Sequence, residues 1–236
     1  MSKVSVDTSQ PSPYIESDSR LHTIKRKLTY AFAIKMIKKY ADVSNFNSLL
    51  EIGTGSGFFL LSCKSEFPEV LLSGIEYDKR LLSVTRRRAP FANCIEGNAE
   101  NFDLYPNKYD VIVSFQVIEH LYNPEAMLSQ VESHLNTGGI FIVTTPNLDG
   151  MGAKIMKERW HGYRKDHVSL KGAKEWEDLI TSNGFEMKFS GSTFFSGISL
   201  MNKLPLAPIN WFFLVFFGAF RWKKGESFVG VFKKNK

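Results

Sequence analysis

Short apolar runs alternate with segments of helical periodicity along most of the chain. Over residues 21–42, apolar residues recur at helical spacing with lysines between them, which predicts an amphipathic helix. Five later apolar runs predict buried strands, at 48–52, 70–76, 92–96, 110–115 and 139–145. Helical periodicity lies between these runs, at 57–65, 79–88 and 124–136. This alternation predicts an α/β fold with a doubly wound, mostly parallel sheet.

The last third of the chain departs from this alternation. A further helix is predicted over 172–184, followed by strand candidates at 185–191 and 227–233. Between these strands lies an apolar insert, residues 195–226, with no polar face at helical spacing. Its most apolar part, 211–220, is shorter than the roughly twenty residues that a membrane-spanning helix needs. The insert is therefore expected to cover a binding site as a lid, to lie in a membrane interface, or to pack as ordinary core.

Composition and charge narrow the picture only a little. The chain has 236 residues, 43% of them hydrophobic, which suits one domain over 21–236 behind a polar, disordered tail at 1–20. The tail has no apolar run of signal-peptide length, and Cys63 and Cys94 fit reduced thiols, so a cytoplasmic location is expected. The net charge of +6 permits contact with nucleic acid or an anionic membrane without requiring either. The candidate segment for peripheral membrane contact is 204–224.

A glycine-rich turn carries the first chemical signal. Gly53, Gly55 and Gly57 alternate directly after the predicted strand 48–52 and before a helix, and Glu51 precedes them. Glycines let the backbone turn tightly and let a ligand approach closely. A carboxylate at this place would repel a pyrophosphate and attract a cation. The pattern therefore fits S-adenosylmethionine, which carries an ammonium and a sulfonium group and no phosphate.

Two later strand ends add polar groups that suit the same ligand. Glu76 ends the second predicted strand, where a carboxylate can accept hydrogen bonds from both hydroxyls of a ribose. Asp78 is expected to cap the helix that follows. Asn98 follows the third strand and can bind an adenine amino group, with a plain surface turn as the alternative.

These features belong to a larger set of motifs that occur in order along the chain. The set comprises Glu51-x-Gly-x-Gly-x-Gly, Gly-Ile-Glu76, Gly97-Asn98-Ala99-Glu100, Tyr109-Asp110-Val111-Ile112, Glu119-His120-Leu121 and Leu135-Asn136-Thr137-Gly138-Gly139. With them the chain resembles class I S-adenosylmethionine-dependent methyltransferases over residues 45–192. It looks closest to the branch of ubiquinone-pathway O-methyltransferases and methyltransferases of bacterial glycan and lipid pathways. The resemblance implies a Rossmann-like, mostly parallel sheet of seven strands, with an antiparallel last strand at 227–233.

The resemblance also implies which residues bind the cofactor. It assigns them in four groups, for the methionine end, the ribose, the adenine and the sulfonium. The groups are Glu51, Gly53 and Gly55; Glu76; Asn98 and Ala99; and Phe115 and Gln116. Tyr77 is expected to bind the cofactor as well.

The segment around Glu119 and His120 holds candidates for chemistry. His120 is a candidate general base, since an imidazole of near-neutral pKa can take a hydroxyl proton. The alternative is that Glu119 and His120 stabilise a loop over the cofactor. Some relatives bind a divalent metal through a Glu-x-x-Glu-His segment, but here Gln116 stands in the first position. Because two ligands on one turn do not make a metal site, no metal is predicted.

A second group of candidates lies after the fifth strand, in residues 160–168, where relatives build acceptor pockets. The residues expected to bind a polar or anionic acceptor are Trp160, Tyr163, Arg164 and His167. For His167, which follows Asp166, ordering of the loop is the alternative. His161 is a second candidate catalytic residue.

The resemblance implies an enzyme that moves the methyl group of S-adenosylmethionine to an oxygen by in-line displacement. The expected partner is a small-molecule or lipid-linked acceptor: a lipid-linked, quinone-like or glycan intermediate. RNA methylation is an alternative suggested by the basic charge, but nucleic acid is disfavoured because the sequence has no stripe of basic and aromatic residues. A non-catalytic partner subunit that binds the cofactor is the third alternative, which the intact cofactor motifs disfavour.

Overall fold

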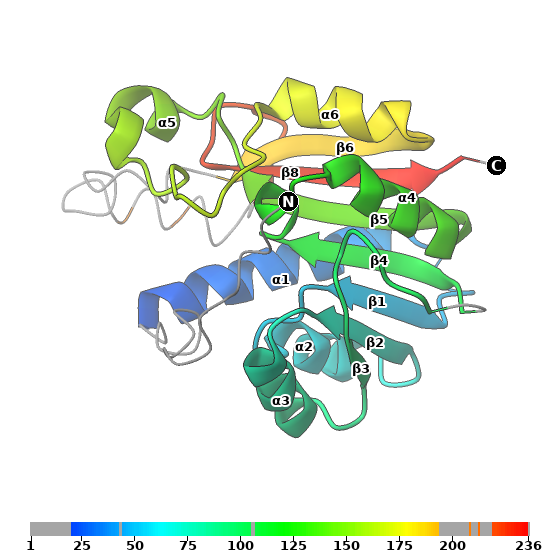
Figure 1. Cartoon of the computed structure of the whole chain (residues 1–236). Helices are drawn as coiled ribbons and strands as arrows, with labels where there is room; N and C mark the ends of the chain where they lie inside the picture. Colours follow the sequence, from blue (N-terminus) through cyan, green and yellow to red (C-terminus); the bar gives the residue numbers. More distant parts are fainter. Residues whose placement is uncertain are drawn as a thin grey trace.

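A single sheet forms the centre of the fold. In the computed structural model, eight strands make up this sheet among the described residues, which are 20–42, 44–104, 107–193, 208, 212 and 219–235 (Figure 1). The strands are β1 (Ser48–Ile52), β2 (Leu71–Glu76), β3 (Asn93–Glu96), β4 (Tyr109–Phe115), β5 (Leu135–Pro146), β6 (Phe185–Thr193), β7 (Ala219–Phe220) and β8 (Ser227–Lys234). Their order is β3-β2-β1-β4-β5-β8-β6-β7, parallel from β3 to β5 and antiparallel beyond it. The predicted α/β fold is confirmed.

The sheet has one strand more than the seven expected. The additional strand, β7, pairs with Ser192 and Thr193 at the end of β6. It falls inside the apolar insert, where two residues are too few to show a periodicity. The antiparallel strand predicted at 227–233 is confirmed as β8, which lies between β5 and β6.

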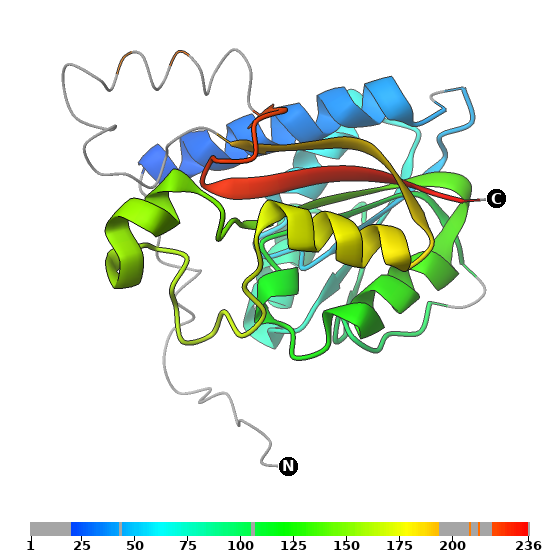
Figure 2. The same cartoon turned by 90° about the horizontal axis from the view of Figure 1, so that it is seen from above.

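Helices cover both faces of the sheet (Figure 2). They are α1 (Arg20–Tyr40), α2 (Phe58–Glu66), α3 (Lys79–Arg88), η1 (Ile118–His120, 3₁₀), α4 (Pro124–His134), α5 (Met151–Met156), η2 (Lys157–Arg159, 3₁₀) and α6 (Ala173–Ser182). One core cluster joins the sheet to α1, α2 and α3 and includes Ile37, Phe59 and Leu82. The other joins it to α4 and α6 and includes Met127 and Trp176. The helices α1, α2, α3, α4 and α6 thus each bury one apolar stripe, as an amphipathic helix does.

The predicted N-terminal helix is confirmed as α1, with slightly different ends. It begins at Arg20, which was expected in the tail, and ends at Tyr40 rather than at residue 42. Ala33, Met36 and Ile37 form its buried face. The helix therefore belongs to the core of the described domain.

The helix predicted over 124–136 ends earlier than expected. α4 stops at His134 and β5 begins with the next residue, so Thr137-Gly138-Gly139 lies inside a strand. The register of β4 against β5 shifts here, and Gly138 has a φ of +78°. Glycine allows this irregular start of the strand because it adopts positive φ without a steric penalty.

Two predictions fall largely outside the described residues. The tail, apart from Arg20, is one, and most of the insert is the other: 195–207, 209–211 and 213–218. The three roles considered for the insert, including membrane contact through 204–224, therefore stay predictions. No described helix combines the length and apolar character needed to cross a membrane.

Candidate functional site

The glycine turn connects the end of β1 to the start of α2. Gly53, Gly55 and Gly57 have φ angles of +78°, +53° and +75°, in the region that side chains rarely adopt. A Cβ on Gly53 would lie 2.3 Å from Cγ2 of Val117, so this glycine lets the segment after β4 pack directly on the turn. A Cβ on Gly55 would meet no described atom within 4 Å. The backbone at Gly55 therefore borders open space, as a ligand-binding turn requires.

Glu51 lies under this turn and is almost fully buried. Its side chain is 2% exposed, and its Oε2 has no hydrogen-bond partner in the part of the chain that the structure describes. Burial, and after it the negative charge of Glu76, raise the pKa of Glu51 well above its usual range. A cation placed here would satisfy the oxygen and offset the repulsion between the two carboxylates. The site therefore fits the ammonium group of S-adenosylmethionine.

Glu76 reaches the glycine turn from the end of β2, as the sequence predicts. Its Oε2 accepts a hydrogen bond from Gly55 N at 2.7 Å, and its Oε1 accepts one from Asp78 N at 3.0 Å. Burial raises the pKa of Glu76, while these backbone hydrogen bonds oppose the increase. Asp78 caps α3 as expected, because its Oδ1 accepts a hydrogen bond from Arg80 N at 2.8 Å.

Helix α3 holds the glycine turn from its outer side, which the sequence did not indicate. Thr85 Oγ1 donates to Gly55 O at 2.8 Å and lies 3.3 Å from Thr54 Oγ1. Arg88 Nη1 donates to Ser56 O at 2.5 Å. The run Arg86-Arg87-Arg88 is typical of a basic helix end, so only the folded arrangement distinguishes Arg88. Thr85 and Arg88 therefore position the turn without lying in it.

The ends of β2 and β3 place the predicted ribose and adenine residues near one another. Glu76 and Glu96 are paired in the parallel register of these strands. Tyr77 is 64% exposed, and Ala99 is buried. Asn98 is exposed, and its Oδ1 accepts a hydrogen bond from Glu100 N at 2.9 Å. The loop after β3 is thus ordered by Asn98 itself.

The end of β4 combines an aromatic contact with backbone strain. The Phe115 ring lies 4.8 Å from Phe59 and 5.5 Å from Tyr30, measured between centroids. Gln116 follows with a φ of +56°, unusual for a residue with a side chain, and its Nε2 donates to Thr144 Oγ1 at 3.2 Å. Strain of this kind clusters at functional sites, where the surrounding structure must enforce it.

Glu119, His120 and His167 come together beside β5. Glu119 is fully buried, and its Oε2 accepts a hydrogen bond from Thr145 Oγ1 at 3.1 Å. Burial raises the pKa of Glu119 to about 8 and lowers those of both histidines. The two imidazole rings meet edge to face with centroids 4.7 Å apart. The sequence proposed different roles for His120 and His167, but the structure places them in contact.

Asp166 organises the loop that carries His167. Arg164 donates to both of its carboxylate oxygens, at 3.0 and 2.9 Å. The Asp166 carbonyl oxygen lies 3.0 Å from His120 Nδ1. Arg164, predicted to bind the acceptor, is thus engaged in an ion pair that fixes the loop against η1. Asp166 was not among the site residues predicted from the sequence. Its position next to His167 was the only feature of the sequence that could have indicated this role.

Trp160 and His161 lie on the same loop, but their side chains approach Glu226, the residue directly before β8. The Trp160 side chain is 1% exposed, and its Nε1 donates to Glu226 Oε2 at 2.7 Å. His161 Nδ1 lies 3.9 Å from the same carboxylate oxygen. Tyr163 is 48% exposed and packs edge-on against the Trp160 indole. Trp160 therefore anchors the loop, while Tyr163 keeps a face open to solvent.

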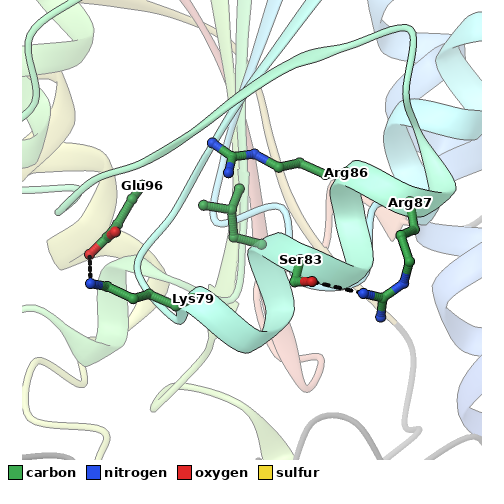
Figure 3. Close-up of a pocket in the computed structure, with 6 residues that line it drawn as sticks. Lys79, Ser83, Arg86, Arg87 and Glu96 are labelled. Atoms are coloured by element: carbon green, nitrogen blue, oxygen red, sulfur yellow. Dashed lines mark hydrogen bonds and ion pairs between the residues drawn. The ribbon is translucent and has the colours of Figure 1, made fainter.

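A hollow of about 380 Å³ lies elsewhere, along α3 and the end of β3 (Figure 3). It is lined by Lys79, Leu82, Ser83, Arg86, Arg87 and Glu96. Figure 3 shows Lys79 pointing toward Glu96, at 3.5 Å, and Arg87 toward Ser83. None of the residues predicted for the site lines this hollow.

Comparison with known proteins agrees with this geometry. The sequence model of the methyltransferase domain family matches residues 20–188. A probable S-adenosylmethionine-dependent methyltransferase of Mycolicibacterium smegmatis is 30% identical over 140 residues, 59% of this chain and 52% of that protein. A malonyl-[acyl-carrier protein] O-methyltransferase of Halalkalibacterium halodurans is 25% identical over 129 residues, 52% of this chain and 48% of that protein. The chain thus spans about half the length of these curated relatives.

A solved structure confirms the fold over nearly the whole chain. The plantazolicin methyltransferase BpumL, in complex with a triazolic desmethylPZN analog and SAH, superposes with a TM-score of 0.66 at 18% identity. The match covers 94% of this chain and 93% of that one. With most of its length matched by the family model, this protein belongs to the methyltransferase domain family, in the S-adenosylmethionine-dependent class I.

Proposed function

We propose that this chain transfers the methyl group of S-adenosylmethionine to an oxygen atom of a small-molecule or lipid-linked acceptor. The observation that carries the proposal is the buried Glu51 carboxylate oxygen, which has no partner among the described residues and borders the open glycine turn. A buried anion without a partner is costly unless a cation joins it. The ammonium group of S-adenosylmethionine supplies that cation.

The cofactor residues follow the expected path along the carboxyl edge of the sheet. Glu51 binds the methionine ammonium, and the backbone of Gly53 and Gly55 lines the same end. Glu76 accepts hydrogen bonds from the ribose hydroxyls. Its carboxylate then gives up the hydrogen bond from Gly55 N and accepts one from the ligand instead. The remaining assignments are Tyr77 at the ribose, Asn98 and Ala99 at the adenine, and Phe115 and Gln116 beside the sulfonium.

The cofactor supplies an electrophilic methyl group, and the chain aligns the acceptor oxygen with it. His120 and His161 are the candidates for taking the acceptor's proton. The His120 Nδ1 faces the Asp166 carbonyl oxygen, so the proton-accepting lone pair lies on Nε2. Burial lowers the pKa of His120, and the imidazole is therefore neutral near pH 7, as a base must be.

The acceptor class is inferred from the resemblance and from one named relative. That relative is a malonyl-[acyl-carrier protein] O-methyltransferase, and its name supports oxygen as the methylated atom. A lipid-linked, quinone-like or glycan intermediate is the proposed acceptor. Tyr163, with its exposed ring, and the Arg164–Asp166 pair form the polar rim near which that acceptor binds.

The test uses purified full-length protein, S-adenosylmethionine labelled at the methyl group, and a cell extract partitioned into organic, nucleic-acid and aqueous fractions. Label in the organic or aqueous small-molecule fraction is expected, and it falls at least tenfold at a subsaturating cofactor concentration when Glu51→Gln replaces the wild type. Exposed Glu69→Gln is the matched control and retains transfer. Label confined to RNA would overturn the acceptor class. Cofactor binding without any transfer would instead favour the non-catalytic subunit.

A further inference from the structure

Three potential metal ligands converge beside the carboxyl end of β4. Glu119 and His120 lie on η1, and His167 lies on the loop that follows α5. One ligand atom from each of them lies within 4.8 Å of the other two. The first two are adjacent in sequence, but the third comes from far along the chain. The fold, rather than a local motif, therefore assembles this cluster.

The loop carrying His167 is fastened directly to η1. Ser169 N donates to Glu119 O at 2.9 Å, and Ser169 Oγ donates to Leu121 O at 2.7 Å. The Asp166 carbonyl oxygen accepts from His120 on the same face. These hydrogen bonds hold the two segments in register, so the cluster does not depend on a chance approach of mobile side chains.

Both imidazoles have their Nδ1 atoms occupied in the same way. His120 Nδ1 lies 3.0 Å from Asp166 O, and His167 Nδ1 lies 2.8 Å from Gly162 O. A carbonyl oxygen only accepts, so each Nδ1 carries the hydrogen and each neutral ring keeps its lone pair on Nε2. Proteins orient metal-binding histidines by this kind of hydrogen bond to a backbone carbonyl.

Glu119 supplies the buried carboxyl group of the cluster. Its side chain is fully buried, and Oε2 is engaged by Thr145. The other oxygen, Oε1, has no hydrogen-bond partner within the described part of the chain. A buried carboxylate oxygen left in this state needs a cation or a donor to compensate for its lost hydration.

We propose that Glu119, His120 and His167 bind one divalent transition-metal ion. Two imidazole nitrogens and one carboxylate oxygen form a ligand set used for zinc and iron(II), with open positions for exogenous groups. Bonds of about 2.0–2.2 Å place tetrahedral ligand atoms about 3.3 Å apart. Since the ligand atoms lie within 4.8 Å of one another, the widest pair closes by at most about 1.5 Å, through rotation of the two half-buried histidine side chains.

This site goes beyond the proposed methyl transfer and does not depend on it. If both hold, the ion lies next to the strained end of β4, where the acceptor is expected. His120 then serves as a ligand and not as the proton acceptor. The amide at Gln116 does not remove the site, because His167 supplies the third ligand that the sequence motif alone lacks.

The test uses tag-free full-length protein, treated with a chelator and titrated with Co²⁺ while visible absorption is recorded. One equivalent of bound Co²⁺ is expected, with absorption bands of a nitrogen-ligated ion, and Zn²⁺ in equal amount displaces it. Glu119→Gln and His167→Ala should each weaken Co²⁺ binding at least tenfold. His161→Ala, on the same loop but outside the cluster, should leave Co²⁺ affinity unchanged.

Circular dichroism of each variant distinguishes loss of Co²⁺ binding from loss of the folded structure. His167→Gln provides a second, more conservative substitution at the same position. The proposal is overturned if the wild type binds less than one tenth of an equivalent, or if folded His167→Ala and Glu119→Gln bind Co²⁺ like the wild type. S-adenosylmethionine affinity is measured separately by calorimetry without Co²⁺. Cofactor binding in a protein that takes no Co²⁺ removes the metal site and leaves the proposed function intact.

Discussion

At the scale of the residue, the buried Glu51, which we propose binds the cofactor's ammonium group, lowers the stability of the folded chain. Its pKa is raised in the folded chain, so ionisation favours the unfolded state as the pH rises above the unfolded value near 4.5. Glu51→Gln removes this charge. We expect the variant without ligand to unfold at a higher temperature than the wild type at pH 7.5, in differential scanning fluorimetry. Its affinity for S-adenosylmethionine should be about tenfold to a hundredfold weaker, as when a charged hydrogen bond is lost.

The same residue predicts how cofactor binding depends on pH. Because ionised Glu51 attracts the ligand's ammonium group, the affinity should rise with pH through the raised pKa of this carboxyl. Calorimetric titrations between pH 5 and pH 8 measure this slope. The slope should be much smaller in Glu51→Gln and unchanged in the exposed control Glu69→Gln. Equal affinities of Glu51→Gln and wild type would remove the ammonium assignment.

Two glycines of the turn should respond differently to the same substitution. Gly53→Ala adds a Cβ 2.3 Å from Val117 Cγ2 at a φ of +78°, so both a clash and backbone strain arise. Gly55→Ala adds only strain of about 1–2 kcal/mol, because no described atom lies within 4 Å. Chemical denaturation should show the larger loss for Gly53→Ala. In calorimetry, Gly55→Ala should fold yet bind S-adenosylmethionine more weakly, since its Cβ enters the ligand's space.

At the scale of the element, α3 positions the cofactor turn. Thr85→Val keeps the shape of a fully buried side chain but loses the hydrogen bonds to Gly55 O and Thr54 Oγ1. We expect a loss of about 1–2 kcal/mol in stability and weaker S-adenosylmethionine binding, measured by denaturation and calorimetry. Thr181→Val on α6 is the control, because the Thr181 hydroxyl donates to the carbonyls of Glu177 and Asp178 in its own helix. If both variants bind the cofactor equally well, α3 has no such role.

Most elements were predictable because burial imposes a periodicity on the sequence. The strand 48–52, its residue Glu51 and the glycines after it could be identified together, since each is set by local chain geometry. Thr85, Val117 and Asp166 could not, because their contacts join segments that only the fold brings together. The same reason explains β7, whose two residues form a strand only through pairing with β6.

At the scale of the whole molecule, the C-terminal segment before β8 supports the loop that carries the proposed acceptor-binding residues. Asn147 N donates to Glu226 O at 3.0 Å, and Met151 N donates to Lys224 O at 2.9 Å. The fully buried Asn147 side chain also donates to Gly225 O at 2.9 Å. Residues from the middle and from the C-terminal part of the candidate domain therefore share one local unit, in which the order of the loop depends on the last strand.

Trp160→Phe tests this dependence. The change removes the indole donor to the buried Glu226 carboxylate while keeping most of the apolar surface. A loss of about 1–3 kcal/mol in stability is expected, because the buried carboxylate then loses its hydrogen bond from the indole. Hydrogen exchange should accelerate in both 157–167 and 221–227 and stay unchanged in β1.

The chain offers a matched control for this experiment in Trp176, which is equally buried but whose Nε1 has no partner among the described residues. Trp176→Phe loses similar volume and no hydrogen bond, so its effect isolates the cost of repacking alone. Faster exchange at 221–227 in Trp160→Phe but not in Trp176→Phe would show that Glu226 couples the loop to the last strand. Equal exchange in both variants would mean that the loop and the C-terminal segment are ordered independently.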